Sequence, residues 1–102
     1  MKLELSRLAL EDLRGIREYT RSTWGREQEE LYLDALWQKL EDIREDSKRW
    51  RFRHDLFPNC QIATQGKHVI LFRIEKETTL QVARILHSAM DLGRHVDPGN
   101  ET

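Results

Sequence analysis

Two consecutive apolar segments, HVILFRIE and LQVARIL, constrain the fold of this chain more than any other feature of its sequence. They occupy residues 68–75 and 80–86, and the residues between them suit a tight turn. An antiparallel hairpin in a small domain usually buries one face and leaves the other in water. Here both faces carry apolar side chains, and a chain of 102 residues has few elements with which to cover both. The pattern therefore predicts a β-hairpin with a spare apolar face.

The expected register decides which side chains share that spare face. Pairing of Glu75 with Leu80 brings these residues together on it: Val69, Leu71, Arg73, Val82, Arg84 and Leu86. The opposite face then holds Ile70, Phe72, Ile74, Ala83 and Ile85, which should pack on helices. We expect the spare face to be a docking groove. Its two arginines favour a partner that carries carboxylates or other anions, because guanidinium groups bind carboxylates with two hydrogen bonds.

The residues before the hairpin predict a short strand and two helices. Leu3 and Leu5 alternate with polar neighbours, Ser6 suits a helix N-cap, and Gly25 ends the first helix. The first helical stripe is Ala9, Leu13, Ile16 and Thr20. A second helix is expected from about Arg26 to Asp46, with a stripe of Tyr32, Leu36, Leu40 and Ile43 that Leu33 and Trp37 widen. Because almost no linker separates the two helices, they should form an antiparallel α-hairpin.

A further strand at residues 60–65 precedes the β-hairpin, with Gly66 in the turn between them. The predicted fold class is α+β, with an N-terminal strand, an antiparallel α-hairpin and a three-stranded antiparallel meander. Residues 1–96 are expected to form a single domain, and residues 97–102 a polar C-terminal tail.

Composition excludes several classes of function. The net charge of -1 argues against wholesale coating of nucleic acid. The single cysteine, Cys60, fits a reducing cytoplasm and is expected to be a small core residue. No stretch is apolar enough for a signal peptide or a membrane span, so we expect a cytoplasmic protein without membrane contact. The four histidines lack cysteine or carboxylate partners at ligand spacing, so neither a metal nor another cofactor is predicted.

Residues spread along nearly the whole chain carry a family resemblance. Trp24-Gly25 follows an amphipathic helix, GKHVI occupies residues 66–70, and RILH at residues 84–87 precedes Met90-Asp91. In this order and spacing the sequence resembles the ParE branch of the RelE/ParE toxin superfamily of bacterial toxin–antitoxin modules.

The resemblance implies a function that the residue patterns alone do not show. ParE-like proteins poison DNA gyrase and form a hetero-oligomer with ParD, a ribbon-helix-helix antitoxin whose C-terminal tail wraps the toxin. Operator DNA is then contacted only through the antitoxin. We expect a non-catalytic toxin of this kind, with candidate target contacts at Trp24, His87, Arg94 and His95. A degenerate toxin that serves only as a scaffold in the antitoxin complex is a further hypothesis.

The alternative hypothesis is a ribosome-dependent mRNA endonuclease of the RelE-like branch. Arg73 and Arg84 would stabilise phosphate charge and His87 would move a proton. Against this, a C-terminal catalytic tyrosine is missing, because the only tyrosines, Tyr19 and Tyr32, fall on the expected helices. Two departures bear on toxic activity of either kind: Gln61 stands where a basic residue is expected, and Gln81 interrupts the last apolar strand. The basic and aromatic segment KRWRFRH, residues 48–54, keeps the alternative open, because such mixing suits phosphate contacts and base stacking. More often such a segment is a solvated connection whose aromatic side chains cap a core.

Overall fold

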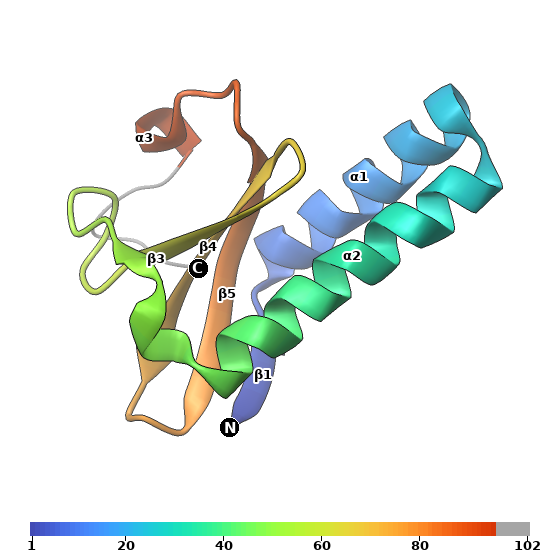
Figure 1. Cartoon of the computed structure of the whole chain (residues 1–102). Coiled ribbons are helices and arrows are strands. Elements are labelled where there is room, and N and C mark those ends of the chain that lie inside the picture. The colour runs from blue at the N-terminus through green and yellow to red at the C-terminus, as the bar shows by residue number, and fades with distance from the viewer. Residues whose placement is uncertain (96–102) are drawn as a thin grey trace.

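The structure, a computed structural model, describes residues 1–95 (Figure 1). Its elements are β1 (Lys2–Leu5), α1 (Arg7–Trp24), α2 (Arg26–Glu45), the short 3-10 helix η1 (Ser47–Arg49), β2 (Arg51–Phe52), β3 (Gln61–Gln65), β4 (His68–Glu75), β5 (Thr79–His87) and α3 (Leu92–His95). The predicted α+β class and the order of strand, α-hairpin and meander are confirmed, and most boundaries agree to within one residue. The predicted tail at 97–102 lies outside the described residues.

The strands form one mixed sheet in the order β1-β5-β4-β3-β2. The strand β1 runs parallel to β5, with Leu3 beside Leu80, and the remaining pairs are antiparallel. The two-residue edge strand β2 was not predicted from the sequence. The α-hairpin covers one face of this sheet, and its closed end extends beyond the strands (Figure 1). No helix within residues 1–95 is long and apolar enough to span a membrane.

Local sequence signals fix both ends of α1 as expected. The Ser6 hydroxyl oxygen accepts a hydrogen bond from the Ala9 backbone N–H at 3.0 Å, which satisfies one of the free donors at the helix start. The same hydroxyl donates to the Ala83 carbonyl at 2.7 Å and so ties the helix start to β5. Gly25 separates α1 from α2 with φ of 93°, a conformation that other residues rarely adopt.

The main core lies between the α-hairpin and the sheet. It combines the predicted helical stripes with one sheet face, and its buried members are Ala9, Ile16, Leu33, Leu36, Leu40, Ile43, Ala63, Ile70, Phe72, Leu80, Val82 and Ile85. Trp37 is 42% exposed, so its predicted place in the α2 stripe is wrong. Successive side chains of an α-helix are about 100° apart around its axis, so Trp37 points away from the line of Leu36 and Leu40.

A β-bulge in β5 corrects the predicted register. Leu71 pairs with Arg84 as expected, but Phe72 pairs with Val82, so Ala83 is an extra residue between these pairs. Beyond the bulge every side chain of β5 changes face. Val82 therefore belongs to the main core under the helices, and the prediction that it lines the spare face is wrong. Ala83 takes the opposite face, which also corrects its predicted position.

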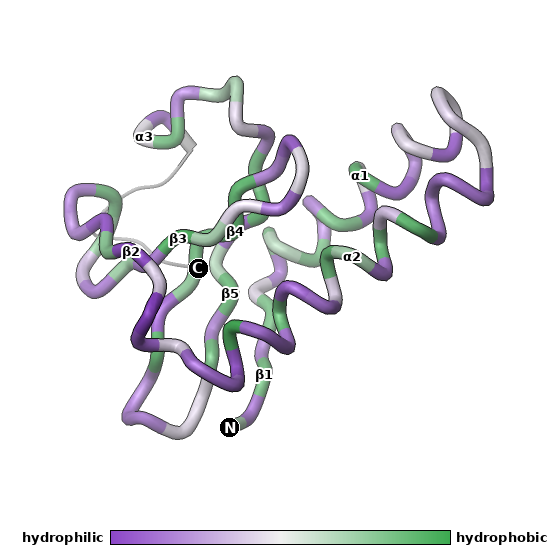
Figure 2. Tube along the Cα trace, in the orientation of Figure 1, coloured by the Kyte–Doolittle hydropathy of each residue, from purple (hydrophilic) through white to green (hydrophobic). Residues whose placement is uncertain are grey.

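The second sheet face is covered by the chain itself. Val69, Leu71 and Leu86 form a second core with Leu56, Phe57 and Cys60, which come from the connection between β2 and β3. Leu71 is 0% exposed and Leu86 is 3% exposed, so the predicted exposed apolar patch is wrong. Figure 2 shows hydrophobic residues along most of β4 and β5, which run between the α-hairpin and this connection. Cys60 is a buried core residue as expected, and burial raises the pKa of its thiol to about 12.

Leu36→Ala is expected to lower the free energy of unfolding by about 2–5 kcal/mol, because Leu36 is buried in the main core and its removal leaves a cavity. Urea unfolding followed by circular dichroism measures this change. The control is Leu31→Ala on the same helix, since Leu31 is 59% exposed and its loss should cost less than about 0.5 kcal/mol. Equal effects of the two variants would contradict the assignment of Leu36 to the core.

Candidate functional site

Arg84 and Asp12 form a mostly buried ion pair that joins β5 to α1. Asp12 Oδ2 accepts from Arg84 Nε and Asp12 Oδ1 from Arg84 Nη2, both at 2.9 Å. The two side chains are only 18% and 14% exposed. The hydrogen bonds from Arg84 to Asp12 raise the pKa of the guanidinium above its ordinary value, so Arg84 stays charged. The predicted partner of Arg84 was an external carboxylate, and the structure supplies an internal one.

Asp12 also completes the hydrogen bonding of β5. The strand β1 ends at Leu5, which lies beside Val82, so later residues of β5 have no β1 neighbour. The Ile85 backbone N–H donates to Asp12 Oδ2 at 2.9 Å and is satisfied in this way. The Asp12 side chain on α1 therefore replaces the backbone acceptor that a neighbouring strand would otherwise provide at the edge of β5.

Arg73 lies on the sheet face away from the helices and also contacts polar groups of the chain. Its Nε donates to Gln81 Oε1 at 3.1 Å, and its Nη2 lies 3.1 Å from Glu75 Oε2. Gln81, which interrupts the apolar pattern of β5, is thus the partner of an arginine on the neighbouring strand. The side chain of Arg73 remains 23% exposed, so part of it reaches the surface.

An open groove of about 650 Å³ lies next to Arg73. It runs between the end of β1, the exposed part of β5 and the connection that covers the second core. Its lining includes Glu4, Arg7, Phe57, Arg73, Gln81, Val82 and Ala83. Of the six residues predicted to form the groove, only Arg73 and Val82 line this one. We call it the sheet-face groove.

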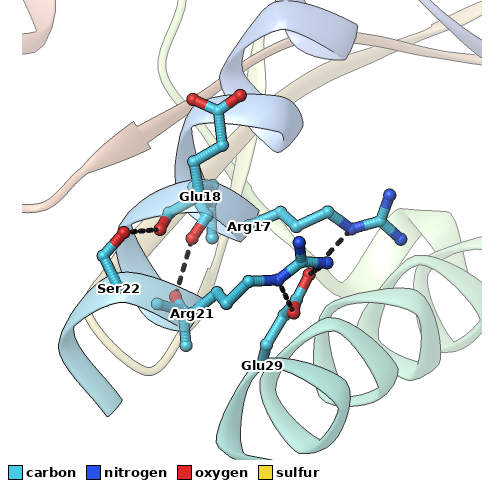
Figure 3. Close-up of polar contacts among 7 residues, drawn as sticks. Arg17, Glu18, Arg21, Ser22 and Glu29 are labelled. Atoms are coloured by element: carbon cyan, nitrogen blue, oxygen red, sulfur yellow. Dashed lines mark hydrogen bonds and ion pairs between the residues drawn. The ribbon is translucent and has the colours of Figure 1, made fainter. Parts of the chain in front are cut away.

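A buried carboxylate near the closed end of the α-hairpin was missed in the sequence (Figure 3). Glu29 is 4% exposed and accepts hydrogen bonds from Arg21 Nε at 2.8 Å and Arg21 Nη2 at 3.2 Å. Arg17 Nε lies 3.1 Å from Glu29 Oε2. The hydrogen bond from Arg21 is the main reason that the pKa of Glu29 is lowered, so Glu29 stays ionised. The sequence signal that could have revealed Glu29 is its position four residues before Leu33, because that spacing places both side chains on the same, buried face of α2.

The α-hairpin exposes several large apolar side chains at different points along its length. Trp24 is 69% exposed and Trp37 is 42% exposed, so neither side chain is part of a core. Leu10, Tyr19 and Leu31 are exposed by more than half as well. Because exposed aromatic groups are enriched at contact surfaces between proteins, this surface is a second candidate for partner binding.

Tyr32, His68 and His87 form a polar cluster where α2 meets β4 and β5. Tyr32 Oη lies 2.6 Å from His68 Nδ1 and donates to the Gln65 carbonyl at 2.9 Å. The rings of His68 and His87 meet edge to face with centroids 5.6 Å apart. His87 Nδ1 accepts from the Ala89 backbone N–H at 3.0 Å, which gives His87 a structural contact at the end of β5. Burial, and next the neighbouring His87, lower the pKa of His68 below its ordinary value of 6.5.

The four candidate target contacts do not share one surface. Trp24 ends α1 at the closed end of the α-hairpin, whereas Arg94 belongs to α3, and Figure 1 shows these parts of the molecule well apart. Arg94 is 83% exposed at its side chain, and His87 is half-buried at the end of β5. His95 is the last residue of α3, and its side chain lies outside the described part of the structure. Within residues 1–95 no three histidine, cysteine or carboxylate groups cluster as metal ligands would.

Comparison with a solved structure identifies the fold, and a family model identifies the class of protein. The fold is similar to that of the chromosomal ParDE toxin–antitoxin system from Pseudomonas aeruginosa, with a TM-score of 0.73, 19% identity and coverage of 85% of this chain and 95% of that one. This is the RelE/ParE-like fold. Residues 3–92 match the family model described as the ParE toxin of the type II toxin–antitoxin system, parDE. The chain therefore belongs to the ParE family of type II toxins.

Curated relatives agree with this family. The chain is 32% identical over 81 residues to Toxin ParE from Escherichia coli, with 79% of each chain covered. It is 29% identical over 92 residues to Toxin ParE1 from Mycobacterium tuberculosis (strain ATCC 25618 / H37Rv), covering 90% of this chain and 94% of the relative. The resemblance inferred from the sequence is confirmed.

Asp12→Ala is expected to lower the free energy of unfolding by about 2–4 kcal/mol, because it leaves Arg84 and the Ile85 N–H without their carboxylate. Chemical denaturation measures the loss. The matched control is Glu11→Ala, which removes an exposed carboxylate one residue away and should change stability by less than about 0.5 kcal/mol. A small effect of Asp12→Ala would show that this ion pair does not hold α1 on β5.

The lowered pKa of His68 predicts a pH dependence of stability. Above pH 6.5 His68 is neutral in both the folded and the unfolded chain, so its contribution is fully present. As the pH falls from 6.5 through the lower folded-state pKa, His68 in the unfolded chain binds a proton more readily than His68 in the folded chain. The free energy of unfolding therefore decreases. Denaturant midpoints between pH 7.5 and about pH 5 should therefore fall less in His68→Gln than in the wild type. His54→Gln, at an exposed histidine, should follow the wild type, and identical slopes in all three proteins would contradict the prediction.

Proposed function

We propose that this toxin inhibits DNA gyrase by direct protein–protein binding and that a ParD-like antitoxin neutralises it in a cytoplasmic hetero-oligomeric complex. Membership of the ParE family supports this proposal, because the resemblance to ParE-like proteins implies gyrase as the target. The similar Pseudomonas aeruginosa structure belongs to a ParDE system, which favours an antitoxin as the partner. Operator DNA is then reached through the antitoxin.

The observation that favours binding over bond chemistry is the engagement of the two sheet arginines. An arginine that stabilises a phosphate in a transition state must direct its guanidinium group at the substrate. Arg84 instead donates through Nε and Nη2 to the mostly buried Asp12. Arg73 contacts Gln81 and Glu75. Both side chains thus hold the shape of the sheet surface, which suits a protein that acts through recognition.

The sheet-face groove is the proposed place for part of the antitoxin. Its accessible lining includes the cationic side chains of Arg7 and Arg73 and the half-buried Ala83. Val82 from the predicted set and Phe57 border the groove but are themselves buried in the two cores. Three other residues of the predicted groove, Val69, Leu71 and Leu86, are buried in the second core. The sixth, Arg84, forms an ion pair with Asp12. Trp24, His87, Arg94 and His95 remain the proposed contacts with the target. Trp24 and Arg94 are the two of these that the structure describes as highly exposed.

The purified chain is expected to inhibit supercoiling by gyrase, and prior addition of its antitoxin should remove the inhibition. In cells, induced expression should stop growth while total mRNA stays intact. His87→Ala removes one of four proposed target contacts and should weaken growth arrest only in part, whereas loss of a general acid or base would cost roughly a hundredfold in rate.

The opposite pattern would identify a nuclease. Undisturbed supercoiling together with cleavage of ribosome-bound mRNA, abolished by His87→Ala, would replace gyrase inhibition by the endonuclease hypothesis. Growth without arrest, with both readouts unchanged and antitoxin binding retained, would identify a scaffold that has lost its toxicity.

A further inference from the structure

The segment of residues 48–54 at the edge of the sheet carries an exposed surface that the proposed gyrase and antitoxin contacts do not use. It contains η1 and β2, and β2 is the edge strand next to β3 (Figure 2). Within it are four cationic side chains, Lys48, Arg49, Arg51 and Arg53, and no acidic one. Lys48, Arg49 and Arg51 are exposed. The overall charge of -1 hides this local excess of positive charge.

Two aromatic rings lie flat against each other on the same segment. The rings of Phe52 and His54 are stacked with centroids 4.9 Å apart and an angle of 10° between their planes. Phe52 is 48% exposed and His54 is exposed as well, so the stacked pair presents ring surface to the solvent. A flat exposed ring beside cations is the arrangement on which an unpaired base stacks while its phosphates meet lysine and arginine.

The backbone of this segment is held in place from beneath. The Gln61 side-chain amide donates to the carbonyls of Ser47 at 2.7 Å and Trp50 at 3.1 Å. The Arg53 backbone N–H donates to the Cys60 carbonyl at 2.8 Å. Because these contacts fix the chain before any ligand arrives, binding costs little ordering of the backbone. They also explain why a glutamine occupies position 61, where a basic residue was expected.

The nearest acidic side chain does not cancel the charge of the whole segment. Asp55 forms a two-hydrogen-bond pair with Arg53, with both distances at 2.8 Å. The Arg53 guanidinium lowers the pKa of Asp55 to about 2, so this carboxylate stays ionised and engaged with Arg53. Arg49 lies over the ring of Trp50, 4.6 Å from its centroid, which orients a second guanidinium at the surface. Lys48, Arg49 and Arg51 then supply the net positive charge.

From these observations we propose that residues 48–54 bind single-stranded nucleic acid. Lys48, Arg49 and Arg51 contact the phosphates, and a base stacks on the Phe52–His54 pair. Single-stranded nucleic acid fits better than an acidic peptide, because carboxylates use the cations but gain little from flat stacked rings. It fits better than a duplex, whose bases are already stacked on one another and unavailable to Phe52. The proposal is separate from gyrase inhibition and does not depend on it.

Fluorescence anisotropy of labelled 12-residue oligothymidylate and oligouridylate, titrated with the full chain at several salt concentrations, tests the proposal. Saturable binding to one or both is expected, with affinity falling as salt rises. Phe52→Leu keeps an apolar residue but removes the ring, and should raise Kd at least about fivefold. Lys48→Gln with Arg51→Gln should reduce the slope of log K against log salt by about 0.7 for each cation removed.

Matched controls on the α-hairpin separate a local site from general attraction. Arg14→Gln with Arg26→Gln removes the same charge from exposed positions elsewhere, and Tyr19→Leu removes a ring that is 67% exposed. These variants should bind as the wild type does. Circular dichroism melting verifies that every variant is folded.

Several results would overturn the proposal. One is a dissociation constant weaker than about 10⁻⁴ M at physiological salt, the weak limit of non-specific binding. Others are equal losses in the hairpin controls or equal affinity for a 12-base-pair duplex. Displacement by oligoglutamate at the same charge concentration would identify an acidic peptide as the ligand instead.

Discussion

Burial of β4 and β5 on both faces is the constraint on which the rest of this structure depends. The α-hairpin covers one face, and the connection from Leu56 to Cys60 covers the other. A protein of 102 residues achieves this by making an irregular connection part of a second core. Leu71 and Phe72 are neighbours in β4, and both are 0% exposed although they point into different cores. The surface left for partners is therefore what these two layers do not reach, namely the sheet-face groove, the closed end of the α-hairpin and the outer edge at β2.

Polar contacts then place the layers relative to one another. Asp12 binds Arg84 and the Ile85 N–H, which fixes α1 along β5 where β1 ends. Tyr32 contacts His68 and the Gln65 carbonyl, which fixes α2 at the turn between β3 and β4. Glu29 joins the two helices through Arg17 and Arg21. Ion pairs around a buried or mostly buried carboxylate, such as Asp12 or Glu29, add little net stability against an apolar alternative, but they penalise any other packing that leaves the carboxylate unpaired.

This arrangement places the candidate surfaces in separate parts of the fold. The two arginines that would face a ligand in the nuclease hypothesis, Arg73 and Arg84, each pair with a carboxylate of the chain. The exposed aromatic groups lie on the α-hairpin and on β2, at two different ends of the fold. A small toxin with distinct surfaces can meet its target and its antitoxin without requiring one site to fit both.

The order of elements, the caps at Ser6 and Gly25, both helical stripes and the core cysteine could be predicted from the sequence, because they depend on local periodicity and backbone preferences. The family followed from residues spread along the chain. The bulge at Ala83 could not be predicted, since a one-residue insertion in a ladder leaves the apolar pattern nearly unchanged while it moves Val82 to the other face. Only the tertiary structure decided that Leu56, Phe57 and Cys60 cover the spare face and that Asp12 meets Arg84 across 72 residues of sequence. These contacts depend on where distant segments come to lie in space, which local sequence patterns do not encode.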